Sequence, residues 1–234
     1  MVEIFKTKDS ICSYILFPNY NGYNYKVTHG IFNNLEKYNL KKFGCPSISS
    51  VSNKVYNANS YISVEIEFGL KDDEPYYEYE LDEKSTHLNS DVHLFMSTIC
   101  FIQNVNGVVN FQLLSPYALV TDDKELEFTT IMPNMKTENC LYVHGGYRPY
   151  YWIRNFNSAW TLKDHSKPGK LFFNIEDPMV SIVFNKSVKL NHIESDKKIL
   201  DYINQSVNSN FIRKNLSKVY SNALHRRPKR LLKP

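Results

Sequence analysis

The sequence predicts a mainly β protein: an antiparallel sandwich or roll, followed by two C-terminal helices and a basic tail. Tyr (17) and Phe (14) are abundant while Gly is scarce (8), and aromatic side chains suit pleated strands better than helices. Apolar and polar residues alternate with period two in several short segments. Turn residues separate these segments at close spacing without a βαβ rhythm, so a doubly wound nucleotide-binding sheet is not expected.

The N-terminal quarter predicts a hairpin, a helix and a loop. Ile11–Phe17 is an apolar run that ends at the turn cluster Pro18–Gly22, and Tyr23–Val27 is expected to be its return strand. Apolar residues at helical spacing predict a short helix within Ile31–Leu40. The polar stretch Ser47–Asn59 is expected to be a loop.

Two hairpins carry the clearest strand signals. Ser60–Leu70 and Pro75–Leu81 both alternate, and a charged connector joins them, which predicts an antiparallel pair with an acidic outer face. Asn106-Gly107 separates the apolar runs His93–Val105 and Val108–Leu114. An Asn-Gly pair favours a type I′ turn, which needs positive φ at both residues.

The remaining strands and the C-terminal elements follow from the same signals. Strands are expected at Tyr117–Thr121, Leu126–Met132, Leu141–His144 and Asn155–Leu162, with Lys170–Ile175 and Val180–Phe184 as a further pair. Ser195 is a suitable N-cap for a helix from Asp196 to Asn204, and Phe211–Leu224 has an amphipathic helical pattern. The predicted units are a β-rich domain (1–190), helices packed on it or on a partner (191–224) and a basic tail (225–234).

The stretch from Cys140 to Leu162 is the best candidate for a binding site. It holds both tryptophans, Trp152 and Trp160, which are expected to anchor the core, and the Gly145-Gly146 pair, which permits a sharp turn with positive φ. Its aromatic rings and guanidinium groups could stack on a sugar, a base or a proline-rich peptide. Alternatively, alternate residues point into the core and the arginines pair with acids. The candidate set is Tyr147, Arg148, Tyr150, Tyr151, Trp152 and Arg154.

Charge is distributed unevenly along the chain. The formal net charge is +4, but the eight Lys and Arg residues after position 212 face no acid there, which leaves the rest of the chain with 20 basic and 24 acidic residues. The tail is expected either to bind nucleic acid or an acidic protein, or to serve only as a solubilising end. Its basic residues are Arg226, Arg227, Lys229, Arg230 and Lys233.

The cysteines and the apolar runs indicate the compartment. Cys12, Cys45, Cys100 and Cys140 are widely spaced, which predicts free buried thiols in a reducing interior rather than disulfides. The N-terminus lacks the features of a signal peptide, and no apolar run approaches the length of a membrane span. We therefore expect no membrane partner.

No catalytic signature is present in the sequence. Paired carboxylates fall in predicted turns, where acids commonly make local hydrogen bonds. No catalytic residue, metal ligand or cofactor is assigned, and a non-catalytic protein is favoured. The alternative is a small metal-dependent enzyme on a cupin-like roll, using histidines such as His87, His93 or His144 with a nearby acid.

Three segments together resemble a group of uncharacterised proteins of large tailed phages, with distant bacterial relatives classed as a domain of unknown function. The segments are Phe43–Ser50, Pro133–Asn139 with the following Gly-Gly-Tyr-Arg-Pro, and Asp177–Met179 with Phe184-Asn185. The resemblance implies a viral origin and a location in the host cytoplasm or the virion, and it brings no activity and no functional residue.

The functional expectation is a non-catalytic phage-encoded binding or assembly protein, either a virion component or a host-directed accessory factor. A protein partner or self-association is expected. The alternatives are the metal-dependent enzyme and a nucleic-acid-binding protein that acts through its basic tail.

Overall fold

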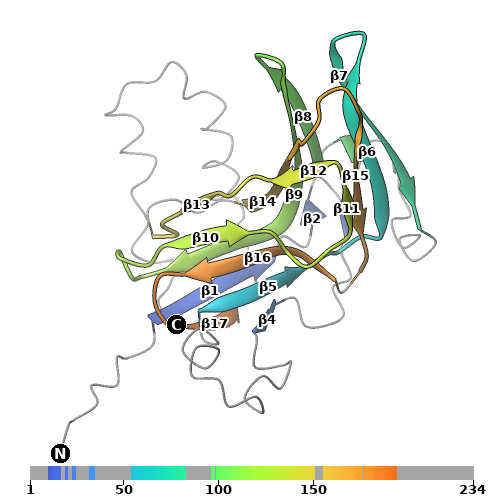
Figure 1. Ribbon diagram of the computed structural model, residues 1–234. Helices are drawn as coiled ribbons and strands as arrows, with labels where there is room; N and C mark the ends of the chain where they lie inside the picture. Colours follow the sequence, from blue (N-terminus) through green and yellow to red (C-terminus); the bar gives the residue numbers. More distant parts are fainter. Residues whose placement is uncertain are drawn as a thin grey trace, which may run out of the picture.

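The structure is a computed structural model that describes residues 10–16, 19–20, 23–24, 32–34, 54–82, 96–97, 99–150, 155–175 and 177–193 of the 234-residue chain. This part is mainly β, as predicted, and its strands form antiparallel sheets in a sandwich-like arrangement (Figure 1). None of the described residues belongs to a helix that is long and apolar enough to cross a lipid bilayer.

The largest sheet has six strands. Its main path is β12 (Cys140–Tyr142), β14 (Asn155–Leu162), β9 (Val108–Thr121), β1 (Ser10–Leu16) and β17 (Val188–Ile193), and β8 (Cys100–Val105) pairs with the first half of β9. The β1–β17 pair is parallel, whereas the other pairs in this sheet are antiparallel.

Two smaller sheets and a short hairpin complete the described fold. The five-stranded sheet runs β13 (Gly146–Tyr147), β10 (Phe128–Ile131), β16 (Pro178–Phe184), β5 (Val55–Asn59) and β4 (Phe32–Asn34). The four-stranded sheet runs β11 (Thr137–Glu138), β15 (Gly169–Phe173), β6 (Val64–Lys71) and β7 (Glu74–Leu81). The hairpin is β2 (Asn19–Tyr20) with β3 (Tyr23–Asn24).

A single buried core joins the six-stranded sheet to the other two. The hydroxyl of Tyr56 on β5 donates to the backbone oxygen of Val188 on β17 at 2.6 Å, and that of Tyr61 donates to the backbone oxygen of Leu114 on β9 at 2.7 Å. The predicted anchor Trp160 is fully buried, and its indole nitrogen donates to the Ser158 hydroxyl at 2.7 Å. These bonds satisfy polar groups whose burial would otherwise be costly.

The two predicted hairpins are confirmed. β6 and β7 pair through a two-residue turn in which Asp72 and Asp73 both have positive φ. β8 and β9 pair around Asn106 and Gly107, whose φ values of 53° and 82° are those a type I′ turn requires. Both hairpins project from the same end of the molecule (Figure 1).

Two predictions for the region before residue 60 are wrong. Phe32–Asn34 within the expected helix is strand β4, and Val55–Asn59 within the expected loop is strand β5. The polar residues of β5 hid its alternation, because Tyr56 and Ala58 are buried while Asn57 accepts a hydrogen bond from Ser181 on β16. Asn57 therefore accepts a hydrogen bond between two strands of a sheet, although asparagine is common in loops.

Several predicted strand pairings and limits are also wrong. β3 pairs with β2, whereas β1 pairs with β9 and β17, so Tyr23–Val27 is not the return strand of β1. β15 and β16 are not a hairpin, because β15 pairs with β6 and β11 while β16 pairs with β5 and β10. The expected strands Val108–Leu114 and Tyr117–Thr121 are one continuous strand, β9, and the expected strand from His93 begins only at Cys100, because Met96, Ser97 and Ile99 are helical.

The positive φ that Gly145-Gly146 permits is adopted by neither glycine. Gly146 is needed for close approach instead. A Cβ at Gly146 would lie 2.2 Å from the backbone oxygen of Phe128, whereas at Gly145 the nearest atom would be 3.8 Å away. Asn139 is among the residues that do adopt positive φ, at 53°.

The prediction of buried thiols is confirmed for the cysteines that the structure describes. Cys12, Cys100 and Cys140 are buried thiols, and burial raises the pKa of Cys100 to about 12 and that of Cys140 to about 11. Cys45 lies outside the described residues. The residues of the two expected C-terminal helices and of the tail also lie outside them, and β17 extends the β region to Ile193, past the expected boundary at 190.

Candidate functional site

The described half of the predicted aromatic and arginine set is packed against its own protein. The ring of Tyr147 meets Phe128 edge-on at 4.5 Å. Arg148 pairs with Glu127 and, at 3.9 Å, with Glu125, so an external anion would have to compete with two carboxylates. The Lys124 ammonium lies over the Tyr150 ring at 5.6 Å. Tyr151, Trp152 and Arg154 lie outside the described residues, as do all five basic residues of the tail.

The histidines considered for a metal site are not brought together by what the structure describes. His144 Nδ1 lies 3.0 Å from the backbone oxygen of Thr130, and its ring meets Tyr142 edge-on at 5.4 Å. His87 and His93 fall outside the described residues. Within those residues no group of three or more His, Cys, Asp or Glu side chains could hold a metal ion.

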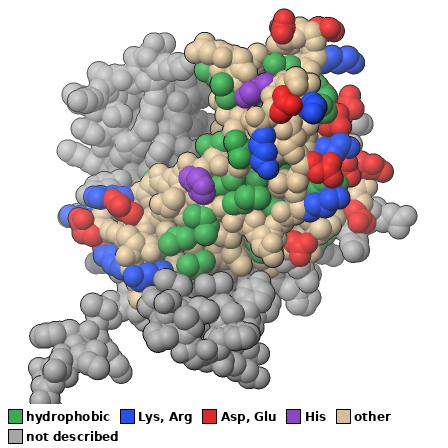
Figure 2. All heavy atoms as spheres, viewed as in Figure 1, with side chains coloured by type: hydrophobic (Ala, Val, Ile, Leu, Met, Phe, Trp, Pro, Cys, Tyr) green, Lys and Arg blue, Asp and Glu red, His purple; other side chains and the backbone are tan. Residues whose placement is uncertain are grey.

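The four-stranded sheet has the predicted acidic outer face. Glu65 lies opposite Glu80 and Glu67 opposite Glu78, an arrangement of like charges that is unfavourable by itself. Lys170 on β15 offsets it, with its Nζ 3.1 Å from Glu65 and 3.4 Å from Glu67. Hydrogen bonds to Glu65 and then Glu67 raise the pKa of Lys170. Figure 2 shows acidic and basic side chains gathered on the side of the molecule where β6, β7 and β15 lie in Figure 1.

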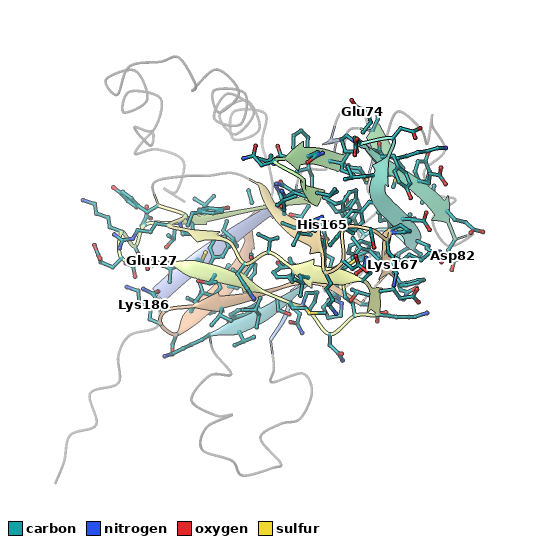
Figure 3. All side chains as sticks on the ribbon, turned by 45° about the horizontal axis from the view of Figure 1, so that its top comes forward. Glu74, Asp82, Glu127, His165, Lys167 and Lys186 are labelled. Carbon is teal, nitrogen blue, oxygen red and sulfur yellow. The ribbon has the colours of Figure 1, made fainter. Side chains whose placement is uncertain are left out.

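An open pocket of about 470 Å³ lies beside this acidic face. Carboxylates and apolar side chains share its walls, so its chemistry suits a cationic group next to an aliphatic or aromatic surface. The lining residues are Val64, Glu65, Glu80, Leu81, Asp82, Phe172, Phe173 and Asn174. In Figure 3, Asp82 and Glu74 lie at the side of the molecule opposite to Glu127 and Lys186.

The outer surface of the six-stranded sheet has a different character. On β9 the side chains of Val109, Phe111 and Leu113 are buried, so the residues between them point away from the core. The register extends this outward set across four neighbouring strands, β12, β14, β9 and β8. We call this set the uncharged face: Phe101, Gln103, Val105, Val108, Asn110, Gln112, Leu114, Leu141, Val143, Asn157, Ala159 and Thr161.

Apolar side chains border the uncharged face on two sides. Leu141 (49% exposed) and Val143 (39%) lie on the β12 side, and Phe101 (48%), Val105 (48%) and Val108 (42%) lie on the β8–β9 hairpin. Among the described residues only one other large apolar side chain, Met132 beyond β10, is exposed to this extent. Exposed apolar side chains grouped in this way are typical of an interaction site.

The two inner strands of the face, β14 and β9, carry polar side chains whose hydrogen-bonding groups are partly paired within the face. Asn157 Nδ2 donates to Gln112 Oε1 at 2.9 Å, and the Thr161 hydroxyl donates to the backbone oxygen of Val109 at 2.7 Å. Asn157 Oδ1 is buried and accepts no hydrogen bond from the part of the chain that the structure describes. An acceptor in this situation costs about 1–3 kcal/mol, which a donor on a segment lying over it would recover.

The uncharged face was not predicted from the sequence, although the sequence contains one feature that indicates it. No Asp, Glu, Lys or Arg occurs from Val92 to Thr121, in a chain that is 22% charged. The strand register that places Leu141 beside Thr161, and Thr161 beside Asn110, cannot be derived from the sequence. No family model, curated protein or solved structure matches the chain.

Proposed function

We propose that the protein is a non-catalytic binding or assembly protein, encoded by a tailed phage, whose protein partner docks on the uncharged face. The observation that carries the proposal is the absence of any ionisable side chain from twelve outward positions on four adjacent strands. Exposed sheet surfaces normally carry charges that oppose association. The buried centres of protein interfaces are depleted of charge in the same way as this surface.

The composition of the face favours a protein over a charged ligand. Nucleic acid is held mainly by Lys and Arg contacts to phosphate, and the face has neither residue. Apolar borders around a centre of amides and hydroxyls offer both burial and hydrogen bonds to a polypeptide. The phage origin rests on the sequence resemblance. With that origin, the protein acts either in the virion or in a complex with a host protein.

The test inserts charge into the face and, as a matched control, into the opposite sheet. Phe101→Glu with Leu141→Glu places two carboxylates on the uncharged face. Thr129→Glu with Met132→Glu places two at exposed positions on and just beyond β10. The full chain would be followed by sedimentation velocity, both purified and in extracts of infected cells, with purified virions examined in parallel.

In extracts of infected cells we expect the wild-type chain and the control to sediment in a particle larger than the 27.4 kDa monomer, and the face variant to sediment as the monomer, as we expect of the purified wild-type chain. Loss of the large species in the control alone, or in neither variant, would overturn the proposal. Recovery of the protein in virions identifies a structural component, and recovery only in extracts identifies a host-directed factor. Circular dichroism checks that both variants keep their β spectrum.

A further inference from the structure

We infer that residues 211–224 of the same chain dock on the uncharged face in the free protein, as an amphipathic helix that a partner must displace. This inference rests on the proposed function, because it identifies what occupies the proposed partner surface before assembly. The sequence predicts one apolar stripe along that helix, formed by Ile212, Leu216, Val219, Tyr220 and Ala223.

The position at which β17 ends supports residues 211–224 as the segment that covers the face. Ile193, the last residue of β17, lies in one row with Ile15, Ala118 and Asn155 on successive neighbouring strands. Asn155 is two residues before Asn157, which is at the margin of the face. The described chain therefore ends level with that margin, three strand spacings or about 14 Å away.

The chain beyond β17 is long enough to reach the face. The 17 residues from 194 to 210 join β17 to the expected helix. The expected helix from Asp196 to Asn204 within it is about 14 Å long, and each of the other eight residues can add up to about 3.3 Å, so the linker can span the distance. By contrast, the segment 35–53, also outside the described residues, is bounded by β4 and β5 of the opposite sheet.

The size of the face fits one helix better than a second copy of the protein. Four strands with outward segments of about six residues cover roughly 20 × 20 Å. A stable interface between two proteins buries about 800 Å² on each partner, twice this projected area. A 14-residue helix is about 21 Å long and about 10 Å wide, so it can lie across the four strands.

The chemistry of the face fits the same segment. Leu141 and Phe101 offer apolar surface at opposite borders, where a stripe of aliphatic and aromatic side chains can be buried. On a regular helix Lys214 and Lys218 fall on the side away from the stripe, so their charges stay in water while the uncharged face is covered. The unsatisfied Asn157 Oδ1 marks where a polar side chain from the covering segment is expected to donate.

A photo-cross-linking experiment on the full chain tests the inference without assuming a register for the helix. A benzophenone amino acid replaces Leu141 on the face and, in the control, Thr129 on β10. After irradiation of dilute purified protein, we expect the Leu141 probe to form an adduct with a peptide from residues 211–224 within the monomer band. The Thr129 probe should give no such adduct.

Two variants sharpen this result. Leu216→Glu with Val219→Glu disrupts the stripe and should abolish the adduct, whereas Ser217→Glu with Ser221→Glu places the same charges on the other side of the helix and should keep it. An adduct to 211–224 found only in a cross-linked dimer would overturn docking within one chain and identify a second copy instead. An adduct elsewhere, no adduct, or equal adducts from both probes would also overturn the inference.

The failure of the inference can be told apart from failure of the proposed function. If 211–224 is not captured but the charged face variant still loses its large species in sedimentation, only the inference fails. If the face variant assembles like its control, the proposed function fails whatever the probe captures. When both hold, the Leu216→Glu/Val219→Glu variant should bind the partner more tightly than wild type, because a competing segment has been removed.

Discussion

The ring of Phe68 on β6 stacks on the ring of Phe111 on β9, with centroids 5.0 Å apart and an angle of 25° between the planes. Both side chains are fully buried. This contact joins the four-stranded sheet to the six-stranded sheet directly beneath the uncharged face, since Asn110 and Gln112 flank Phe111 on the outside. The face is therefore supported by packed core on its inner side.

Replacement of Phe68 by alanine should remove this support. We expect the free energy of unfolding to fall by about 3–5 kcal/mol, because a large cavity remains in the core. The matched control is Met132→Ala beyond β10, where the side chain is exposed and the stability should change by less than about 1 kcal/mol. Urea denaturation followed by tyrosine and tryptophan fluorescence measures both values, and equal losses in the two variants would contradict the packing described.

The Gly145-Gly146 pair provides a test that needs no ligand. Gly146→Ala should destabilise the protein by about 1–3 kcal/mol, because its Cβ would collide with the backbone oxygen of Phe128 and separate β13 from β10. Gly145→Ala should have little effect, since the nearest atom to its Cβ is 3.8 Å away. Thermal unfolding of the two variants compares them directly, and a larger loss for Gly145→Ala would refute the assignment.

Asn139 organises the loop between β14 and β15. Its Nδ2 is within hydrogen-bond distance of the backbone oxygens of Asp164, Lys167 and Pro168, and its Oδ1 accepts from the Asp164 amide. Asn139→Gly keeps the positive φ but loses these bonds, with an expected cost of about 1–2 kcal/mol. Asn139→Ala adds backbone strain and should cost more. Denaturant midpoints rank the two, and the reverse order would show that the φ value is not the constraint.

Lys170 predicts a specific pH dependence. Its pKa in the folded protein is raised above the usual 10.5 by hydrogen bonds to Glu65 and Glu67. Stability from this group is therefore fully present below about pH 10.5 and is lost as the pH rises through the folded-state pKa. Lys170→Met should be less stable than wild type at pH 8, and the difference should shrink at higher pH.

Salt provides the control for this prediction. The Lys170 side chain is 36% exposed, so salt partly screens its interactions, and the difference between Lys170→Met and wild type should also shrink in 1 M NaCl. Melting temperatures across pH 7–11 test both statements. A difference that grows with pH would contradict the assigned ion pairs.

The fold could be predicted from sequence only where its signals are local. Alternation over Ser60–Leu70 and the Asn106-Gly107 turn predict two hairpins that the structure confirms, because each depends on neighbours in the chain. β15 and β16 are separated by only a short turn, yet they enter different sheets. One partner of each, β6 for β15 and β5 for β16, lies more than a hundred residues earlier, and no local pattern encodes that choice.

The same distinction between local and long-range signals applies to the candidate site. The pairing of Arg148 with Glu127 depends on β13 lying beside β10, so the sequence could offer it only as an alternative to an open binding surface. The uncharged face combines residues from Phe101 to Thr161 that only the register of four strands brings together. The sequence shows that Val92–Thr121 contains no charged residue, but it does not show which strands lie beside this segment in the sheet.

The most direct test of the uncharged face is carbene footprinting of the native full-length protein in its assembled form, with each residue normalised to its labelling in the unfolded chain. Phe101, Leu141 and Met132 have nearly equal exposed fractions in the described structure, at 48%, 49% and 45%. We predict that Phe101 and Leu141 are labelled far less than Met132, because a partner or residues 211–224 covers them. Labelling of Phe101 and Leu141 equal to that of Met132 would show that the face is free in water and would contradict its role as an interaction surface.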